Sequence, residues 1–424
     1  MSVPLDIAVT IVDPKAYTDD KKLHQAFAWL RKEMPVGRIE LEGYDPFWAV
    51  TKHADILEVE RQNDLFHNGD RPTVVTTQDA DNKVRMLTGG SPHLIYSLVQ
   101  MDNPDHFNHR KLTQAWFLPQ NIKKLEDGIR GLARAAVDKM AAMGGECDFA
   151  KDIAFLYPLR VIMQILGVPE SDEPRMLKLT QELFGTSDPD MNRSGASPMD
   201  SDALLAGLLE TVQDFTNYFD AITEDRRAHP RDDVASVIAN GKINGEYLTE
   251  RGAMGYYIIV ATAGHDTTSN TTAGGLWALA ENPHEFAKLK ADPGLIPSYV
   301  EETIRWVTPV KHFMRSATAD TEVRGQRIAE GDWLMLCYPS GNRDEEVFPD
   351  PFAFKVDRNP NKHVAFGYGA HVCLGQHLAR MEMRILWEEL LPRLKSVELA
   401  GTPRLTEANF VSGPKTVPIR YVME

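Results

Sequence analysis

Cysteine is scarce in this sequence, with Cys147, Cys337 and Cys373 the only three among 424 residues. So few cysteines in so long a chain exclude a fold built on disulfides. Long hydrophobic runs are also missing, because no stretch of about 18 apolar residues occurs, and this excludes a membrane-spanning helix. Residues 1–15 lack the basic-then-apolar order of a signal peptide. We therefore expect a cytoplasmic protein.

Positive charge is in short supply as well. The chain has 46 Lys and Arg against 61 Asp and Glu, a formal net charge of −15. A partner such as nucleic acid, held by bulk positive charge, is therefore excluded. The 43% hydrophobic content is enough for a large core. The length allows several domains, but no repeat or linker divides the chain, so we expect a single domain over residues 1–424.

The sequence also lacks a regular alternation of strands and helices, and this absence excludes a doubly wound sheet. Apolar residues at helical spacing through the middle, with shorter apolar runs near both ends, predict a mainly α protein with a minor β part. Two polar, turn-rich stretches, 73–92 and 187–201, are predicted to be long mobile loops. The predicted helices are 122–143, 157–166, 174–184, 203–228 and 250–281, and the predicted strands are 48–51, 332–337 and 417–422.

The longest predicted helix, 250–281, has an unusual centre. Nine consecutive residues of low helix propensity, 264–272, stand between two flanks that favour a helix. One of them, Asp266, is an acid among Gly and Thr in apolar surroundings, where burial is costly. A surface helix that exposes its hydroxyls is the alternative. Local rules that fail inside an otherwise consistent element indicate a functional site, and we expect one here.

A glycine-rich turn surrounds Cys373, and a helix is predicted directly after it. Gly367 and Gly369 allow the chain to turn tightly, and Gly375 leaves room for a flat group beside the turn. A thiol at a helix N-terminus faces unpaired N–H groups, which favour the thiolate. From these residues alone, a buried structural cysteine, a nucleophile and a zinc ligand all stay open.

The same segment resembles the haem-binding signature of the cytochrome P450 superfamily. That signature, Phe-x-x-Gly-x-x-x-Cys-x-Gly, is matched in full by Phe366, Gly369, Cys373 and Gly375. The resemblance implies haem b (iron protoporphyrin IX), with Cys373 as the axial ligand of the iron. It also implies a triangular prism of helices with the haem between the central long helix and the helix after the cysteine loop. Thiolate ligation favours O–O cleavage, so the implied activity is that of a monooxygenase.

The centre of the long helix resembles a second motif of that family, Ala-Gly-x-Asp-Thr, at residues 263–267. The resemblance implies a slight opening of the helix that forms a groove for dioxygen. It also implies that Asp266 and Thr267 deliver protons there, a task for which a carboxyl and a hydroxyl are suited. Thr268 follows immediately, and the family register favours Thr267.

Glu302 and Arg305 match the family's Glu-x-x-Arg, a spacing that alone indicates no more than a helical ion pair. The resemblance implies that the pair is buried and joins a third polar group that locks the cysteine loop. Ala353 stands where the family often has the arginine that supplies this group. Arg358 and His363 are both candidates, and the sequence does not choose between them.

Four further residues match the family's positions for the two haem propionates. His106 and Arg110 lie four residues apart and share a helix face. Arg315 and His371 match the other two positions. Taken singly, each would be read as a solvated surface residue. Together they imply cationic partners for a buried dianion.

The substrate and partners follow from the branch of the family that the chain most resembles, the bacterial terpineol hydroxylases. That branch implies a small hydrophobic substrate, a monoterpenoid or a compact aromatic hydrocarbon, in contact with Ala263, Val310 and Phe410. Dioxygen and a ferredoxin with its NAD(P)H-dependent reductase are the implied co-substrate and electron source. Basic residues near the cysteine loop are predicted to steer the acidic ferredoxin: Arg110, Lys111, Arg380 and Arg384.

Three rival functions stay open at this point. A peroxide-driven peroxygenase of this fold replaces the acid–alcohol pair, so Asp266 and Thr267 argue against it. A non-catalytic haem-thiolate sensor usually needs an output module, for which no residues are left over. A cysteine hydrolase is the third rival.

Overall fold

The computed structural model describes residues 2–195 and 200–424. Its α-helices are α1 (Leu5–Val12), α2 (Asp20–Glu33), α3 (His53–Arg61), α4 (Gln78–Thr88), α5 (Asp105–Thr113), α6 (Pro119–Ile122), α7 (Glu126–Ala142), α8 (Leu156–Leu166), α9 (Glu173–Phe184), α10 (Ser201–Ala228), α11 (Val234–Asn240), α12 (Glu250–Ala263), α13 (Asp266–Glu281), α14 (Pro283–Ala291), α15 (Ile296–Val307), α16 (Tyr338–Gly341) and α17 (Gln376–Arg393). Its strands are β1 (Val36–Ile39), β2 (Phe47–Val50), β3 (Phe66–His67), β4 (Glu146–Asp148), β5 (Lys242–Ile243), β6 (Glu246–Tyr247), β7 (His312–Ala317), β8 (Thr321–Val323), β9 (Gln326–Ile328), β10 (Trp333–Cys337), β11 (Leu394–Leu399), β12 (Arg404–Leu405), β13 (Pro414–Thr416) and β14 (Pro418–Met423).

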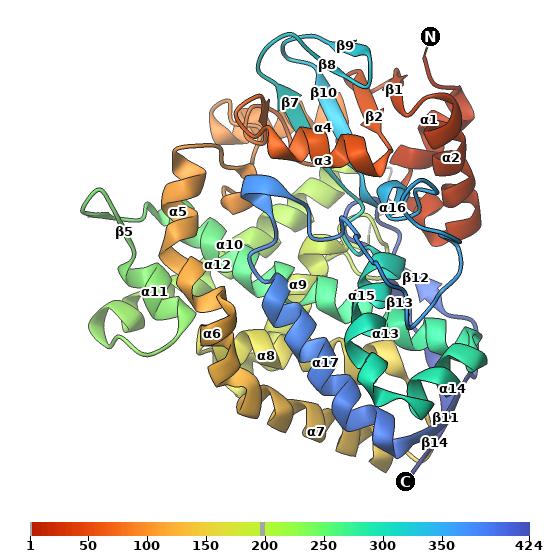
Figure 1. The fold of residues 1–424 in the computed structure, drawn as a ribbon. Coiled ribbons are helices and arrows are strands. Elements are labelled where there is room, and N and C mark those ends of the chain that lie inside the picture. The colour runs from red at the N-terminus through yellow and green to blue at the C-terminus, as the bar shows by residue number, and fades with distance from the viewer. Residues whose placement is uncertain (1, 196–199) are drawn as a thin grey trace.

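Helices form the body of the molecule, and the larger sheet lies at one end of it (Figure 1). That sheet has the strand order β1-β2-β10-β7-β3, with β10 parallel to β2 and antiparallel to β7. The three-stranded sheet β11-β14-β4 lies at the opposite end, near the C-terminus. The mainly α fold with a minor β part is confirmed.

The largest apolar core lies among the long helices. Residues of α7, α8, α12, α13, α15 and α17 form one continuous buried cluster. Large aromatic side chains are part of it: Trp387 on α17 is fully buried, and Phe219 on α10 stacks on Tyr257 of α12 with ring centroids 4.6 Å apart. Because these helices pack through such rigid contacts, the cavity between them has fixed walls.

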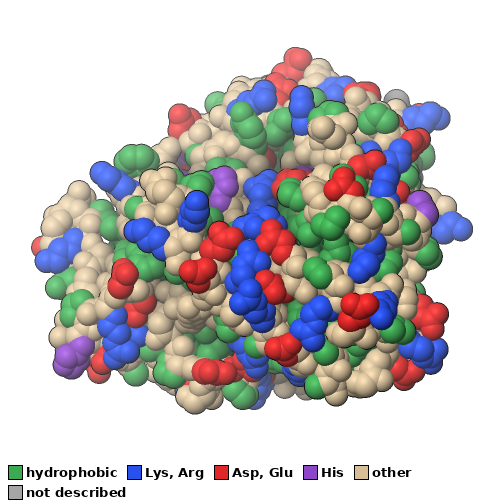
Figure 2. Space-filling view, turned by 60° about the horizontal axis from the view of Figure 1, so that its bottom comes forward, with side chains coloured by type: hydrophobic (Ala, Val, Ile, Leu, Met, Phe, Trp, Pro, Cys, Tyr) green, Lys and Arg blue, Asp and Glu red, His purple; other side chains and the backbone are tan. Residues whose placement is uncertain are grey.

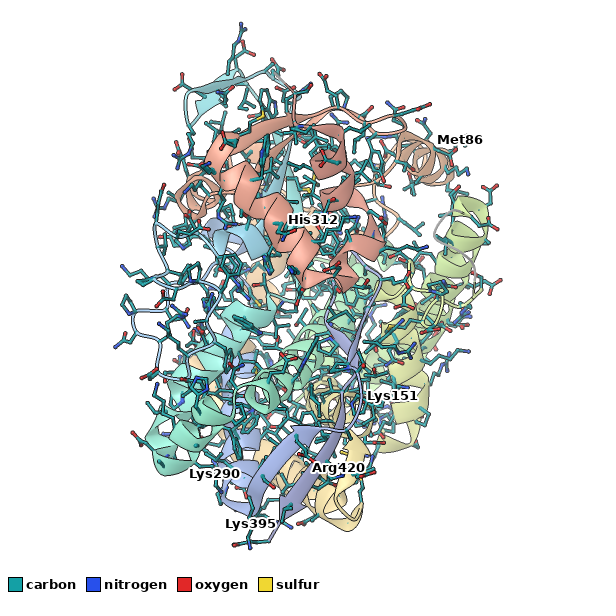
Figure 3. The ribbon with its side chains drawn as sticks, turned by 90° about the vertical axis from the view of Figure 1, so that its right-hand side faces the viewer. Met86, Lys151, Lys290, His312, Lys395 and Arg420 are labelled. Atoms are coloured by element: carbon teal, nitrogen blue, oxygen red, sulfur yellow. The ribbon has the colours of Figure 1, made fainter. Side chains whose placement is uncertain are left out.

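The predicted helices and strands correspond to observed ones with ends shifted by a few residues. The loop prediction for 73–92 is wrong in its centre, which forms α4. Thr77 caps this helix by accepting a hydrogen bond from the Ala80 N–H, and Gly89 ends it in a left-handed conformation. No residue of α4 is buried, and Met86 at its outer edge is 77% exposed (Figure 3). The sequence of α4 is mostly polar and leads into two glycines, so its pattern is typical of a loop.

The other predicted mobile loop, 187–201, lies partly outside the described residues, because 196–199 are not described. Within its first part, Asp188 is fully buried and accepts hydrogen bonds from Lys415 Nζ at 3.0 and 2.8 Å. A buried, charge-assisted contact of this kind ties the segment to strand β13. Ser201 already belongs to α10.

The predicted helix 250–281 is two helices, with a break at Gly264 and His265. A Cβ at Gly264 would lie 2.7 Å from Ile162 Cδ1 on α8, so a side chain there would force Ile162 to shift. The chain resumes a helix at Asp266 despite the low propensity of residues 266–272. Their burial against neighbouring helices therefore outweighs the local preference.

Candidate active site

A cavity lies between the α12–α13 break and the cysteine loop with α17. It brings together most of the residues singled out from the sequence, although they come from segments far apart in the chain. Most of its other lining residues are apolar. The predicted site residues that line it are Ala263, Thr267, His106, Arg110, Val310, Arg315, Phe366, His371, Cys373 and Gly375.

The cysteine loop presents Cys373 to this cavity. The backbone N–H of Cys373 donates to the Phe366 carbonyl at 2.9 Å, which closes the turn. Gly369 adopts φ +71°, and a Cβ there would lie 2.2 Å from the Glu60 carbonyl oxygen, so a side chain has no space. At Gly375, by contrast, a Cβ would have nothing within 4 Å, which is the open space that a flat group beside the loop needs.

The expectation that the helix N-terminus favours the thiolate is only partly confirmed. Burial raises the pKa of the Cys373 thiol, while the Gly375 and Gln376 amides with Arg110 and Arg380 act in the opposite direction. Cys337 is fully buried on β10, and Cys147 lies on β4. Neither lines the cavity, so Cys373 is the cysteine placed for chemistry there.

One part of the cavity wall is rich in nitrogen atoms. The rings of His106 and His371 lie 4.0 Å apart between centroids, and buried His106 Nε2 has no hydrogen-bond partner. Burial and Arg110 lower the pKa of His106 to about 4. Burial and the cations Arg315 and Arg110, with His106, lower the pKa of His371 well below its ordinary value. A group of such donors, with one nitrogen unpaired, suits a buried anion.

The arginines of this wall are held by the protein. Arg110 donates to the Val372 carbonyl at 2.8 Å. Arg315 donates to the Met314 carbonyl at 2.9 Å and to Glu60 at 3.4 Å. Each guanidinium has further N–H groups to offer toward the cavity.

Two carboxyl groups that line the cavity were missed from the sequence. Burial raises the pKa of Glu60 to about 7 despite Arg315 and the Tyr338 hydroxyl beside it. Burial likewise raises the pKa of Glu382 well above its ordinary value, and Thr268 hydrogen-bonds it. Each is a single acid on an amphipathic helix, which is a pattern without a distinguishing signal.

The Glu302–Arg305 pair is buried, and its third partner is Arg358. Glu302 and Arg305 are fully buried and make a bidentate pair at 2.8 and 2.7 Å. Arg358 Nε adds contacts to both Glu302 oxygens at 3.1 and 2.9 Å. The other candidate, His363, contacts Glu301 at 3.0 Å instead. The sequence could not decide this, because both residues lie on the same irregular segment.

This network connects α15 to the segment that precedes the cysteine loop. Arg305 donates to the carbonyls of Asn342 and Pro351, each at 2.9 Å. Arg358 donates to the carbonyls of Pro349 and Ala353, each at 2.7 Å. The two guanidiniums thereby satisfy backbone carbonyls in a segment without regular structure.

The acid and the alcohol of the central motif occupy different surroundings. Thr267 lines the cavity, and its hydroxyl donates to the Ala263 carbonyl at 2.7 Å, so its oxygen lone pairs remain free to accept. Asp266 is 5% exposed, and its Oδ2 accepts no hydrogen bond. Asp266 precedes Thr267 in the chain and is not among the described residues that line the cavity.

The residues predicted to contact the substrate also differ in whether they line the cavity. Ala263 and Val310 line the cavity, and Phe410 does not, as far as the described residues show. Phe410 packs behind the lining residue Phe313, with ring centroids 5.3 Å apart. It also contacts the ring of His312, which lies in the interior (Figure 3). Phe410 therefore supports the wall through Phe313.

The predicted basic patch is largely neutralised. Arg380 pairs with Glu301 at 2.6 Å, and Arg384 pairs with Glu388 at 2.5 Å. Figure 2 shows a band of Lys and Arg on one face with Asp and Glu beside it. Lys111 differs, because it is exposed and in no ion pair among the described residues.

The residues present fit the haem that the sequence resemblance implies. Cys373 offers sulfur to the cavity, Gly375 leaves open space beside it, and His106 Nε2 lacks a partner. Arg110 and Arg315 supply positive charge for two carboxylates. Among the described residues, no helix has the length and apolar character needed to cross a membrane.

Comparison with known proteins gives consistent matches over the whole chain. The family model described as Cytochrome P450 matches residues 14–292 and 294–419. Cytochrome P450-terp from Pseudomonas sp is 50% identical over 420 residues, covering 99% of this chain and 98% of that protein. Linalool 8-monooxygenase from Pseudomonas putida is 32% identical, covering 97% of this chain and 98% of that protein. The crystal structure of CYP108D1 from Novosphingobium aromaticivorans is 45% identical, covers both chains completely and gives a TM-score of 0.91.

Proposed function

The chain belongs to the cytochrome P450 family, and on that premise we propose that it hydroxylates a small hydrophobic substrate, a monoterpenoid or a compact aromatic hydrocarbon. It is a cytochrome P450 monooxygenase, and proteins of this family bind haem b through a cysteine thiolate. One observation carries the proposal: Cys373 and Thr267 line the same, mostly apolar cavity. We further propose a single domain over residues 1–424; its cytoplasmic location stays a prediction.

In this proposal five residues would hold the haem. Cys373 would give its thiolate to the iron, and His106, Arg110, Arg315 and His371 would pair with the propionates. The unpaired Nε2 of His106 gains a partner when the anionic group arrives. When bound, the haem supplies the activation of dioxygen that inserts one oxygen atom into a C–H bond.

The side chains of the protein itself control where protons and water can reach the cavity. Thr267 uses its hydroxyl proton on the Ala263 carbonyl, so its oxygen accepts a hydrogen bond from a group in the cavity. Asp266, one residue away and nearly buried, supplies protons at its carboxyl group. The apolar side chains around them limit the access of water.

The choice of substrate class rests on the apolar lining of the cavity and on the relatives. Ala263 and Val310 add apolar surface to the cavity, and apolar pockets hold small ligands chiefly by burial. Cytochrome P450-terp is 50% identical to this chain, and a linalool monooxygenase is also among its relatives. Steroid C26-monooxygenase, from Mycolicibacterium smegmatis, is 34% identical, which is close to the 32% of linalool 8-monooxygenase. The preference for a small terpenoid over a steroid therefore rests on the 50% identity to cytochrome P450-terp.

We propose dioxygen as the oxidant and a ferredoxin with its NAD(P)H-dependent reductase as the electron source. The presence of both Asp266 and Thr267 supports this over a peroxide-driven peroxygenase, whose oxidant needs no proton relay of this kind. A non-catalytic haem-thiolate sensor would have no use for the pair either.

A binding screen on the ferric holoenzyme tests the substrate class. Terpineol, linalool and naphthalene are expected to displace water from the haem and shift the spin state at micromolar concentration. Testosterone serves as the size control and is expected to give no shift at the same concentration. A shift with testosterone and none with the three small compounds would contradict the proposal.

A further inference from the structure

A buried histidine beside Asp266 has no part in the function described so far. His265 is fully buried at the break between α12 and α13. Its Nε2 lies 2.8 Å from the Phe155 carbonyl oxygen, and its Nδ1 lies 2.8 Å from the Thr180 hydroxyl. Nδ1 also lies 3.3 Å from Asp266 Oδ2. These contacts fix the ring between the start of α8, α9 and the first turn of α13.

The hydrogen-bond partners restrict where protons sit on this ring. A carbonyl oxygen only accepts, so Nε2 must carry a hydrogen toward Phe155. If the ring were neutral, Nδ1 would accept a hydrogen bond from the Thr180 hydroxyl and would offer no donor to Asp266 Oδ2. An ionised carboxylate oxygen would then be buried without any donor, because Oδ2 accepts no hydrogen bond. Such a buried, unpaired charge is strongly unfavourable.

We infer that His265 and Asp266 together hold one proton, either on Nδ1 or on the Asp266 carboxyl 3.3 Å away, and that His265 is the positioning residue that keeps a proton available at Asp266. The inference deepens the proposed function, in which Asp266 supplies protons to the cavity, and it rests on that function. Delivery removes one proton from the pair at the Asp266 carboxyl, and solvent returns one proton. No electrons move in this step.

The Thr180 hydroxyl agrees with this assignment. With the proton on Nδ1, the ring donates and the Thr180 oxygen accepts. Thr180 can then donate its own hydrogen to the Leu177 carbonyl, 3.0 Å away. The oxygens of Phe155, Thr180 and Leu177 then each accept a hydrogen bond, and the charged ring lies 3.3 Å from Asp266 Oδ2.

The shared proton is tested directly on the full-length holoenzyme. In the reduced, carbon-monoxide-bound form, which is diamagnetic, nitrogen-15 NMR of labelled histidine reports the protonation of each ring nitrogen. The His265 signals are identified by their loss in His265→Gln and by their shift in Asp266→Asn, so the assignment does not depend on one variant folding. Infrared spectra of protein with labelled aspartate report whether Asp266 is an acid or a carboxylate.

Two protonated nitrogens on His265, or a carboxylic acid at Asp266, would support the inference. One protonated nitrogen together with an ionised Asp266 would overturn it. Because neither spectrum requires turnover, this result is independent of the proposed reaction.

Turnover then tests the consequence. In His265→Gln we expect product formation to slow by at least about tenfold, with KM and the haem spectrum close to wild type. His53→Gln is the matched control: His53 is also buried, and its Nε2 lies 2.7 Å from the Lys362 carbonyl, outside the cavity. Equal rates in His265→Gln and wild type would overturn the positioning role. Unchanged turnover in Asp266→Asn would instead refute the proposed proton supply.

Discussion

The Glu302 network and the start of α13 are both buried and polar, yet they satisfy their polar atoms very differently. Every side-chain nitrogen of Arg305 and Arg358 donates a hydrogen bond, and both Glu302 oxygens accept several. On α13, Asp266 Oδ2, Ser269 Oγ and Thr272 Oγ1 have no partner. The satisfied side chains of Glu302, Arg305 and Arg358 hold one conformation. The unpaired Oδ2 on α13 belongs to Asp266, the residue for which we propose chemistry.

The difference has a structural origin. The Glu302 network fills a region where the chain has no regular structure, so side chains must satisfy the free backbone carbonyls. In α13 the helix already pairs the backbone N–H and C=O groups, so only the polar side chains still need hydrogen-bond partners. We therefore assign a structural role to the first region and chemistry to the second, and the following predictions test that division.

Breaking the satisfied network has the largest expected effect on folding. Glu302→Gln leaves two buried guanidiniums without their carboxylate, which costs about 3–5 kcal/mol in the free energy of unfolding. The loss is measured by urea denaturation of the holoenzyme and by its haem content. A stability equal to that of the wild type would show that the network is dispensable.

The neighbouring residue offers a matched control. Glu301→Gln changes the adjacent acid, whose partners His363 and Arg380 lower the pKa of Glu301 to about 2. Since this value lies below the ordinary one, Glu301 stabilises the fold above its unfolded-state pKa of about 4.5 and loses that effect as pH falls toward 2. We expect a smaller loss than in Glu302→Gln, and a difference from wild type that shrinks in acid.

Changing the unsatisfied region is expected to alter chemistry and leave folding intact. In Thr267→Ala, haem binding and substrate affinity stay near wild type, while product per electron pair falls by at least about tenfold and hydrogen peroxide rises. Asp266→Asn slows the whole cycle by about 100-fold, because the proton source is lost. The stoichiometry of product and peroxide per NAD(P)H is the measurement. If Thr267→Ala still directed all electrons to product, Thr268 would be the residue that relays protons.

Filling the cavity wall is expected to have an intermediate effect. Ala263→Leu and Val310→Phe add bulk next to the substrate and should weaken its binding by about 1–3 kcal/mol or shift the position oxidised. Spin-state titration and product analysis measure both. Identical affinities and products in both variants would place the substrate elsewhere.

The smallest expected effect concerns the surface. Lys111→Glu removes an exposed, unpaired cation on α5 and should slow reduction by a ferredoxin roughly threefold at low salt. Lys395→Glu makes the same charge change near the C-terminus, at the far end of the molecule (Figure 3), and should have no effect. An equal decrease in the rate of reduction in both variants would show that only the net charge of the protein matters. Substrate affinity stays constant throughout.

The sequence predicts the motif-bearing elements better than the contacts between them. Cys373 was singled out because its glycine-rich motif is specific, whereas Thr267 and the Glu302–Arg305 pair were singled out only through the family resemblance. Contacts that depend on the tertiary fold were not predictable, such as Arg358 as the third partner and Phe410 behind Phe313. Helix α4 was missed because its residues are mostly polar and two glycines follow it. The acids Glu60 and Glu382 were missed because only the folded chain shows that they are buried.

The spectrum of the reduced, carbon-monoxide-bound protein tests the central claim most directly. If Cys373 is the thiolate ligand, the wild-type Soret band is strongly red-shifted relative to histidine-ligated haem, and Cys373→Ala lacks that band. Cys373→His is expected to keep haem with a histidine-type spectrum and to lose oxygenation. A thiolate-type band that persists in Cys373→Ala would contradict the account, because neither Cys147 nor Cys337 lines the cavity.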